Sequence, residues 1–250
     1  MAALAAPATP IHAMPWWVRV AAALVSLAAA IVILGATMVP FFSSTWIDFE
    51  QGRAGSALLT GYSPDEVHQV TGSIVHDLLL GGAFDVQTPC PRLEGCSGLA
   101  PVLDPAEQSH MRDVRGVLDA FAIVVVISLA ALMVAAWLAR SRSAGEAHTE
   151  AVAVVWAAVG RGAAWLAILL VVLGVFAVAA FDLAFELFHR ILFPGGNFDF
   201  DPRTQKLVQL FPEPFWSETV LTFGAVAIAV SLAVAWYTRR RAAVAAGGRP

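Results

Sequence analysis

The chain has 250 residues, of which 58% are hydrophobic and only 14% are charged, with a single lysine, Lys206. Soluble domains are about 45–50% apolar and about 25% charged, so this composition excludes a disordered chain and argues against a water-soluble enzyme. The formal net charge of −4 gives no basic excess, and no nucleic-acid partner is expected. We therefore expect a polytopic membrane protein whose surroundings are membrane lipid.

Four apolar stretches are long enough to cross a bilayer, since a spanning helix needs about 20 apolar residues. They lie at about 18–39, 116–138, 162–183 and 218–238, and the helical pattern of the third continues to about His189. The first is expected to be an uncleaved helix, because no basic region precedes it and its apolar run is too long for a signal sequence. Residues 1–250 are thus interpreted as one all-α membrane domain with four transmembrane helices.

The distribution of basic residues predicts the orientation of the spans. An even number of spans puts both termini on one side of the membrane. That side has eight basic residues, and the other side has seven. The segments that carry the eight are together about half as long as those that carry the seven, and Arg239–Arg241 directly follow a span. The positive-inside rule therefore predicts cytoplasmic N- and C-termini. Segments 40–115 and 184–217 are then extracytoplasmic and form a small cap.

The first outer segment carries the start signals of two helices. Ser63 and Glu66 form a capping box around a proline, and this helix is expected to run to about Leu80. A second helix starts near Pro105 and continues unbroken into the second span. The apolar residues of the first helix recur at helical spacing and face either a core or the membrane: Val67, Val70, Ile74 and Leu78.

Two cysteines, Cys90 and Cys96, enclose five residues in the same outer segment. This spacing does not match a C-x-x-C redox or zinc motif. On the predicted topology the pair is extracytoplasmic, where a disulfide between the two persists. Two free thiols are the alternative that the sequence leaves open.

The second outer segment is dense in aromatic residues and in prolines that interrupt regular structure. We expect its aromatic rings to serve packing and interfacial anchoring rather than direct substrate contact. These rings are Phe193, Phe198, Phe200, Phe211, Phe215 and Trp216.

Two polar clusters lie at the outer ends of spans. They are Glu107, His110 and Asp113 before the second span, and Asp182, Glu186 and His189 at the end of the third. Their spacings keep each cluster on one helix face, and span counting puts both histidines near the outer membrane surface. A histidine beside a carboxylate suits general acid–base catalysis. One alternative is a polar network that only satisfies helix ends. Another is a metal site made of both histidines and the carboxylates, but nothing in the spacing selects a metal, and no metal or cofactor is expected.

The sequence around these clusters resembles the bacterial four-span membrane family that includes the lipoprotein intramolecular transacylases (Lit). The segments that carry the resemblance are Glu107-Gln-Ser-His110-Met-Arg-Asp113-Val114, Phe185-Glu-Leu-Phe188-His189-Arg190 and Asn197-Phe-Asp-Phe-Asp201-Pro202. Together with the order of the spans, the likeness extends over most of the chain.

The resemblance implies an activity and a location. Family members move an acyl chain from the glyceryl sn-2 oxygen of a diacylated lipoprotein cysteine to its α-amino group. Diacylated lipoproteins are therefore the expected substrates, and the bacterial cytoplasmic membrane is the expected location, with the active face outside. The family's functional histidines map onto His110 and His189.

Chemistry suggests roles for the individual residues. His110, oriented by Asp113 or Glu107, is the first candidate base, and His189 beside Glu186 is the candidate acid. The three arginines that flank spans on the outer side, against the charge bias, are expected to bind an anionic group: Arg112, Arg115 and Arg190. Two other functions stay open. One is a non-catalytic envelope protein that binds a partner or lipid, and the other is an acyltransferase with another substrate.

Overall fold

The computed structural model describes residues 15–89, 98–141 and 145–245. The chain divides into two compact units. The first comprises Met1–Thr37, Ala122–Leu173 and Gly224–Pro250; the second comprises Met38–Phe121 and Gly174–Phe223. Each unit is described by itself.

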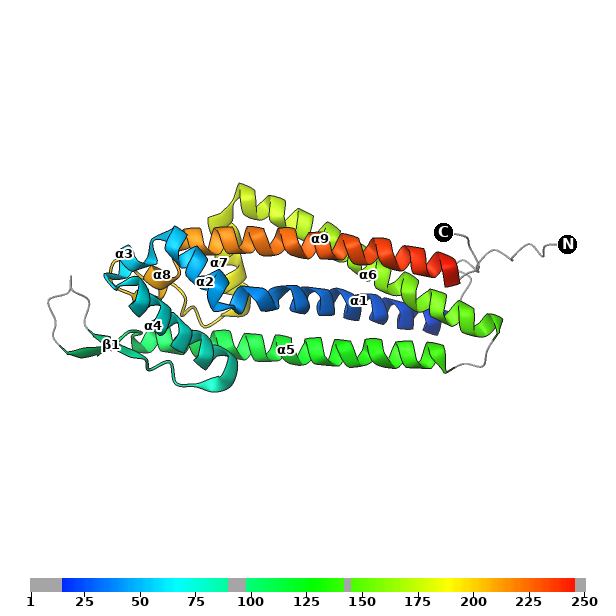
Figure 1. The fold of residues 1–250 in the computed structure, drawn as a ribbon, viewed down its shortest axis with the longest axis horizontal. Helices are drawn as coiled ribbons and strands as arrows, with labels where there is room; N and C mark the ends of the chain where they lie inside the picture. The colour runs from blue at the N-terminus through cyan, green and yellow to red at the C-terminus, as the bar shows by residue number, and fades with distance from the viewer. Residues whose placement is uncertain (1–14, 90–97, 142–144, 246–250) are drawn as a thin grey trace. The chain divides into compact units, whose positions relative to one another are not determined.

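Helices dominate both units (Figure 1). Between α1 (Trp16–Met38) and α5 (Pro105–Arg140), the described residues form a 3₁₀ turn, three short helices, a π-helical turn and two short strands. In chain order the elements are α1 (Trp16–Met38), η2 (Val39–Phe42), α2 (Ser44–Ala54), α3 (Ser56–Thr60), α4 (Pro64–His76), η3 (Asp77–Gly81), β1 (Gln87–Pro89), β2 (Leu99–Pro101), α5 (Pro105–Arg140), α6 (Glu146–Ala179), α7 (Phe181–Leu192), α8 (Lys206–Leu210) and α9 (Glu213–Ala245).

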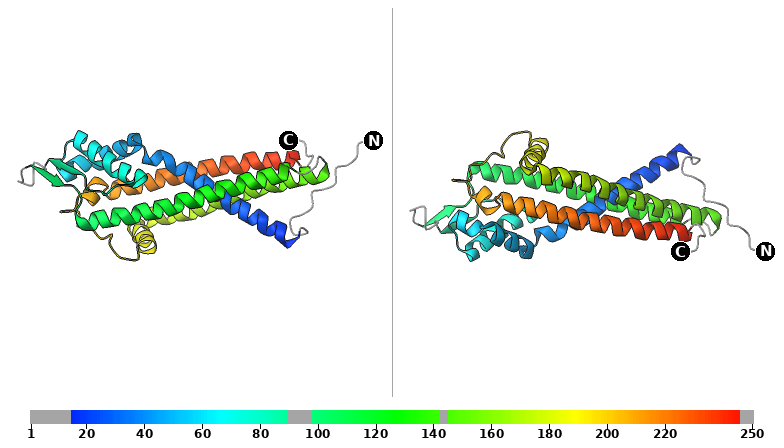
Figure 2. Two further views of the ribbon diagram at one scale, coloured as in Figure 1. Left: turned by 90° about the horizontal axis from the view of Figure 1, so that it is seen from below. Right: turned by 90° about the horizontal axis from the view of Figure 1, so that it is seen from above.

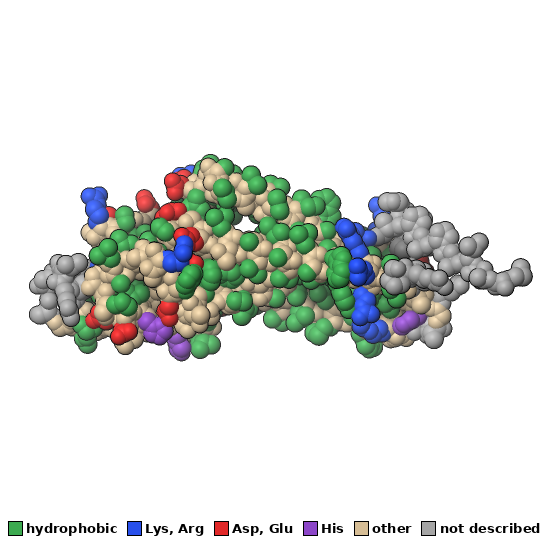
Figure 3. Space-filling model, turned by 45° about the horizontal axis from the view of Figure 1, so that its top comes forward, with side chains coloured by type: hydrophobic (Ala, Val, Ile, Leu, Met, Phe, Trp, Pro, Cys, Tyr) green, Lys and Arg blue, Asp and Glu red, His purple; other side chains and the backbone are tan. Residues whose placement is uncertain are grey.

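Within the described residues, four helices are long and apolar enough to cross a membrane, which agrees with the predicted number of spans. The candidate spans are Trp16–Phe42, Pro105–Arg140, His148–Ala179 and Glu213–Val244. Only 6% of the most apolar window of the second span and 28% of that of the third are buried by protein. The remaining apolar surface, which Figure 3 shows as hydrophobic side chains along the long helices, is left for lipid.

In the first unit the helices approach closely at small residues. A Cβ on Gly162 of α6 would overlap the Ser26 carbonyl of α1, and a Cβ on Gly160 would meet Thr238 of α9. The Ser26 hydroxyl also donates a hydrogen bond across the contact, to the Ala158 carbonyl at 2.8 Å. Such contacts are typical of membrane helices, which associate through close packing. Figure 2 shows α1 crossing the other three helices obliquely.

The second unit has an apolar core of its own. The predicted stripe of α4 faces this core and not the membrane. The buried residues of this core are Tyr62, Val67, Val70, Ile74, Leu78, Phe84, Val102, Leu103, Met111, Leu207 and Leu210. The predicted capping box is present, since Ser63 Oγ accepts from Glu66 N while Glu66 Oε2 accepts from Ser63 N. The α4 helix then passes into the π-helical turn η3, which ends at Gly81.

The third span differs from the prediction at both ends. Helix α6 begins at Glu146, well before 162, and it ends at Ala179, so the predicted continuation to His189 is wrong. The backbone of Ala180 leaves the helical region (φ −153°, ψ 64°), and α7 starts anew at Phe181. The Ala180 and Ala184 amides still bond the carbonyls four residues earlier, so the break leaves neither of these donors unpaired. No glycine or proline marks it.

Two short strands follow Phe84. Gln87–Pro89 and Leu99–Pro101 pair antiparallel, with Thr88 opposite Ala100. The predicted Cys90–Cys96 disulfide lies outside the described residues. Helix α5 runs unbroken from Pro105 to Arg140, as predicted.

Candidate active site

The two predicted histidines meet in the second unit. His110 lies in the second turn of α5, and His189 lies in the last turn of α7. Their rings are nearly parallel, with centroids 5.9 Å apart and 25° between the planes. Both side chains are buried, at 6% and 9% exposure. Residues 79 positions apart in the sequence thus form one compact imidazole pair.

Aromatic rings enclose this pair. Phe193 contacts both histidines, with centroid distances of 4.8 Å to His110 and 5.7 Å to His189. Phe200 packs edge-on against His110 at 5.4 Å, and Phe198 lies 5.3 Å from His189. Phe185 and Phe188 approach His189 from within α7, at 4.1 and 5.3 Å. Such a shell lowers the local dielectric and strengthens electrostatic interactions at the histidines.

One ring nitrogen of His189 is fixed by the backbone. Its Nδ1 lies 2.8 Å from the Phe185 carbonyl oxygen, one turn earlier in α7. A carbonyl only accepts, so Nδ1 carries the proton and Nε2 keeps its lone pair in the neutral ring. Burial lowers the pKa of His189, and the bond to Phe185 opposes this shift only in part. His189 is therefore a neutral imidazole near pH 7, with the Nε2 lone pair available.

A second polar pair lies beside His110. Asn197 Nδ2 donates to Asp113 Oδ2 at 2.6 Å, which joins the loop after α7 to α5. Asp113 also interacts electrostatically with His110, and the Asn197 side chain lies against the His110 side chain. Asp113 thus lies near His110, and its role in orienting that ring stays a prediction. Asn197 was not a predicted site residue, and its position in an irregular loop gave no periodic signal.

The Glu107 carboxylate has two backbone partners. Its side chain is only 1% exposed, and both oxygens accept backbone hydrogens, from Asp104 N and from Leu207 N, each at 2.6 Å. Asp104 Oδ1 in return accepts from Glu107 N at 2.9 Å. Glu107 therefore closes a capping box at the start of α5 and also caps α8. Its role beside His110 remains a prediction.

The other predicted site residues lie apart from the imidazole pair or have other partners. Glu186 pairs with Arg190 at 2.6 Å on the exposed face of α7. Arg115 Nη1 donates to the Gly82 carbonyl at 2.7 Å, and its guanidinium lies 5.2 Å from the Phe84 ring centroid. Arg112 is exposed. Arg115 thereby holds the turn that follows η3, whereas Arg112 and Arg190 stay accessible to solutes.

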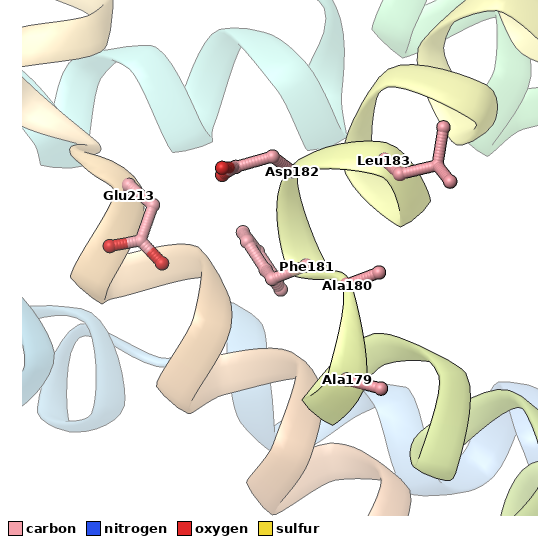
Figure 4. Close-up of a pocket in the computed structure, with 6 residues that line it drawn as sticks. All are labelled: Ala179, Ala180, Phe181, Asp182, Leu183 and Glu213. Atoms are coloured by element: carbon pink, nitrogen blue, oxygen red, sulfur yellow. The ribbon is translucent and has the colours of Figure 1, made fainter.

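A shallow pocket of about 630 Å³ opens beside the start of α7 (Figure 4). It is lined by Ala179, Ala180, Phe181, Asp182, Leu183 and Glu213. In Figure 4 the carboxylates of Asp182 and Glu213 extend toward the same space, so its lining is negative. In the described part of the chain, no three His, Cys, Asp or Glu side chains are grouped to hold a metal ion.

Comparison with known proteins identifies the family. The model of the family described as lipoprotein intramolecular transacylase Lit matches residues 22–216, which is most of the chain. The chain belongs to the Lit family. Lit proteins are lipoprotein intramolecular transacylases, so this Lit-family chain is an acyltransferase-type enzyme. No curated protein matched it.

Solved structures of a Lit protein share the fold. The in meso structure of the membrane-integral lipoprotein intramolecular transacylase Lit from Bacillus cereus aligns with a TM-score of 0.63 and 18% identity, over 90% of this chain and 97% of that one. Two further structures of the Bacillus cereus protein carry one histidine replaced by arginine or by alanine. Each aligns at TM-score 0.62 and 18% identity, over 90% of this chain and 92% or 93% of theirs. This likeness confirms the predicted all-α, four-span membrane fold.

Proposed function

We propose that this Lit-family protein transfers an acyl chain within one diacylglyceryl lipoprotein, from the glyceryl sn-2 oxygen to the α-amino group of the terminal cysteine. His110 and His189 supply the acid–base catalysis. The observation that supports this reaction best is the buried, stacked imidazole pair inside its aromatic shell.

The proton balance of the reaction explains the need for two bases. The substrate amine begins as an ammonium with three protons, and the product amide nitrogen keeps one. One of the two lost protons goes to solvent before attack, because an ammonium has no lone pair. The other goes to the glyceryl oxygen when the ester C–O bond breaks and the amide C–N bond remains. Two neutral imidazoles match these two transfers.

We assign the first transfer to His110 and the second to His189. Asp113 lies near His110 and stabilises the imidazolium that forms when the ammonium is deprotonated. His189 is neutral and has a free Nε2 lone pair, so it can take the proton from the attacking nitrogen and pass it to the leaving oxygen. Donor and acceptor belong to one molecule, so the protein only has to fold the substrate's head into attack geometry.

The surface of α7 supports placing this chemistry at the membrane boundary. A single residue, Ala180, separates α7 from the apolar span helix α6. Four apolar side chains on α7 are 42–76% exposed: Leu183, Leu187, Phe188 and Ile191. In the proposed arrangement they lie in the outer leaflet of the bacterial cytoplasmic membrane, and His189 on the buried face of α7 reaches the depth of the substrate's ester.

The opposite end of the spans supports cytoplasmic termini. Arg239–Arg241 follow the apolar part of α9. Arg240 lies 4.0 Å from the ring centroid of Trp236, and Arg241 donates to the Tyr237 hydroxyl at 2.8 Å. Arginines that directly follow a span are typical of the cytoplasmic side, and aromatic rings such as these anchor a span end at either interface.

The test is mass spectrometry of a reporter lipoprotein's N-terminal peptide in a host that lacks N-acylation. Wild-type protein should yield N-acyl, lyso-glyceryl cysteine, and His110→Gln or His189→Gln should leave diacylglyceryl cysteine. The control is Arg203→Gln, an exposed change outside the proposed machinery, which should behave as wild type. An unmodified cysteine with wild-type protein present in the membrane would refute the proposed reaction.

A further inference from the structure

Two buried polar atoms at the site are without a hydrogen-bond partner among the described residues. They are Nδ1 of His110 and Oδ1 of Asn197. The two side chains lie against each other. A buried polar group without a partner is unfavourable by about 1–3 kcal/mol. If one of these two atoms donates a hydrogen bond to the other, both penalties are removed, and this needs only a small adjustment of the two side chains.

Asp113 determines which end of the Asn197 amide faces His110. A carboxylate only accepts hydrogen bonds, so the amide group that lies 2.6 Å from Asp113 Oδ2 is the NH₂. The carbonyl oxygen, Oδ1, is then the end left for His110. An acceptor at that position requires the proton of the neutral imidazole to be on Nδ1.

We propose that Asn197 is a positioning residue that accepts the Nδ1 proton of His110 and so leaves Nε2 as the basic nitrogen. This inference rests on the proposed function. It gives His110 the same tautomer that the Phe185 carbonyl gives His189. Both rings of the stacked pair then present an Nε2 lone pair to the substrate, which the two proton transfers require.

The loop that holds Asn197 is built to reach this position. Phe193, which contacts both imidazoles, accepts a hydrogen bond on its carbonyl from Gly196 N at 3.1 Å. Gly196 has φ 72°, a left-handed conformation that glycine adopts without strain. The turn brings the next residue, Asn197, back toward α5. Gly196 thus serves the geometry of His110.

The test reads the tautomer directly, without turnover. Protein labelled with ¹⁵N-histidine is placed in lipid nanodiscs at pH 8, where the ring is neutral, and the His110 signals are assigned by their absence in His110→Gln. Wild-type protein should show a protonated Nδ1 and an unprotonated Nε2. Asn197→Ala should shift His110 toward the Nε2-protonated form and lower kcat by about tenfold or more, with little change in KM.

A second variant tests the orientation step separately. Asp113→Ala frees the amide to rotate and present its NH₂ to Nδ1, so it should cause a similar tautomer shift while Asn197 is retained. Asp199→Ala, an exposed change in the same loop, is the matched control and should leave the His110 signals unchanged.

His110 signals that stay at wild-type positions in Asn197→Ala or in Asp113→Ala would overturn the proposal. The failure of the proposed function is distinguishable, because it would appear as absent transacylation while the tautomer shift is still observed.

Discussion

Replacing Glu107 should lower stability much more than it lowers the activity of the folded protein. The side chain is 1% exposed, and its two oxygens accept from Asp104 N and Leu207 N. Each bond to a charged acceptor contributes about 1.5–3 kcal/mol, so Glu107→Ala removes about 3–6 kcal/mol. At about 2–4 °C per kcal/mol for a chain of this size, the Tm should fall by roughly 6–24 °C. The cavity left behind adds to this loss.

The assay is thermal unfolding in detergent micelles, followed by lipopeptide turnover at a temperature where the variant is folded. Glu107→Gln should be intermediate, because one amide oxygen still accepts while the NH₂ meets a backbone donor. Glu186→Ala is the matched glutamate control: its partner is the exposed Arg190, and its Tm should stay near that of wild type. A wild-type Tm for Glu107→Ala with turnover reduced 100-fold would refute this reasoning and make Glu107 a catalytic group.

Three further predictions concern the histidines and the helix contacts. His110→Gln should lower kcat by about 10²–10⁴-fold, while circular dichroism and Tm show an intact fold. Because burial lowers the pKa of His189, the unfolded chain takes up a proton there more readily than the folded protein as the pH falls below about 6.5. The Tm should thus be constant above that pH and fall below it, and His189→Gln should reduce the fall. Gly162→Val should disrupt the contact with Ser26 and lower the Tm. Gly174→Val should leave the Tm unchanged, because no described atom outside the helix's own backbone lies within 4 Å of a Cβ added there. Equal Tm values for the two variants would contradict the close packing.

The sequence predicts that both histidines lie at one membrane depth, because both lie at the ends of apolar helices. Helical period and span length are local properties, and together they put His110 and His189 at one level. The contact of their rings, at 5.9 Å, agrees with that prediction. The capping box at Ser63 was predictable for the same reason, since its signal lies within four residues.

Other features depend on contacts that no local pattern encodes. Asn197 reaches Asp113 across 84 positions of sequence, through a glycine turn whose direction the sequence does not specify. The spacing of Glu107 predicts a place near His110, but it gives no sign that the Glu107 carboxylate accepts a hydrogen bond from the backbone N–H of Leu207 in α8, 100 residues later. The break at Ala180 is hard to predict because neither glycine nor proline marks it. The local signal that the sequence does carry is the change from the apolar C-terminal half of α6 to the amphipathic α7.

The central claim is that the acyl chain moves within one lipoprotein molecule. The most direct test mixes two diacylglyceryl lipopeptides, which differ in peptide mass and in the isotopic label of the sn-2 chain, with the purified protein in nanodiscs. Mass spectrometry should find N-acyl, lyso-glyceryl products in which each peptide carries only its own chain. Products in which the labels have crossed between peptides would contradict an intramolecular transfer.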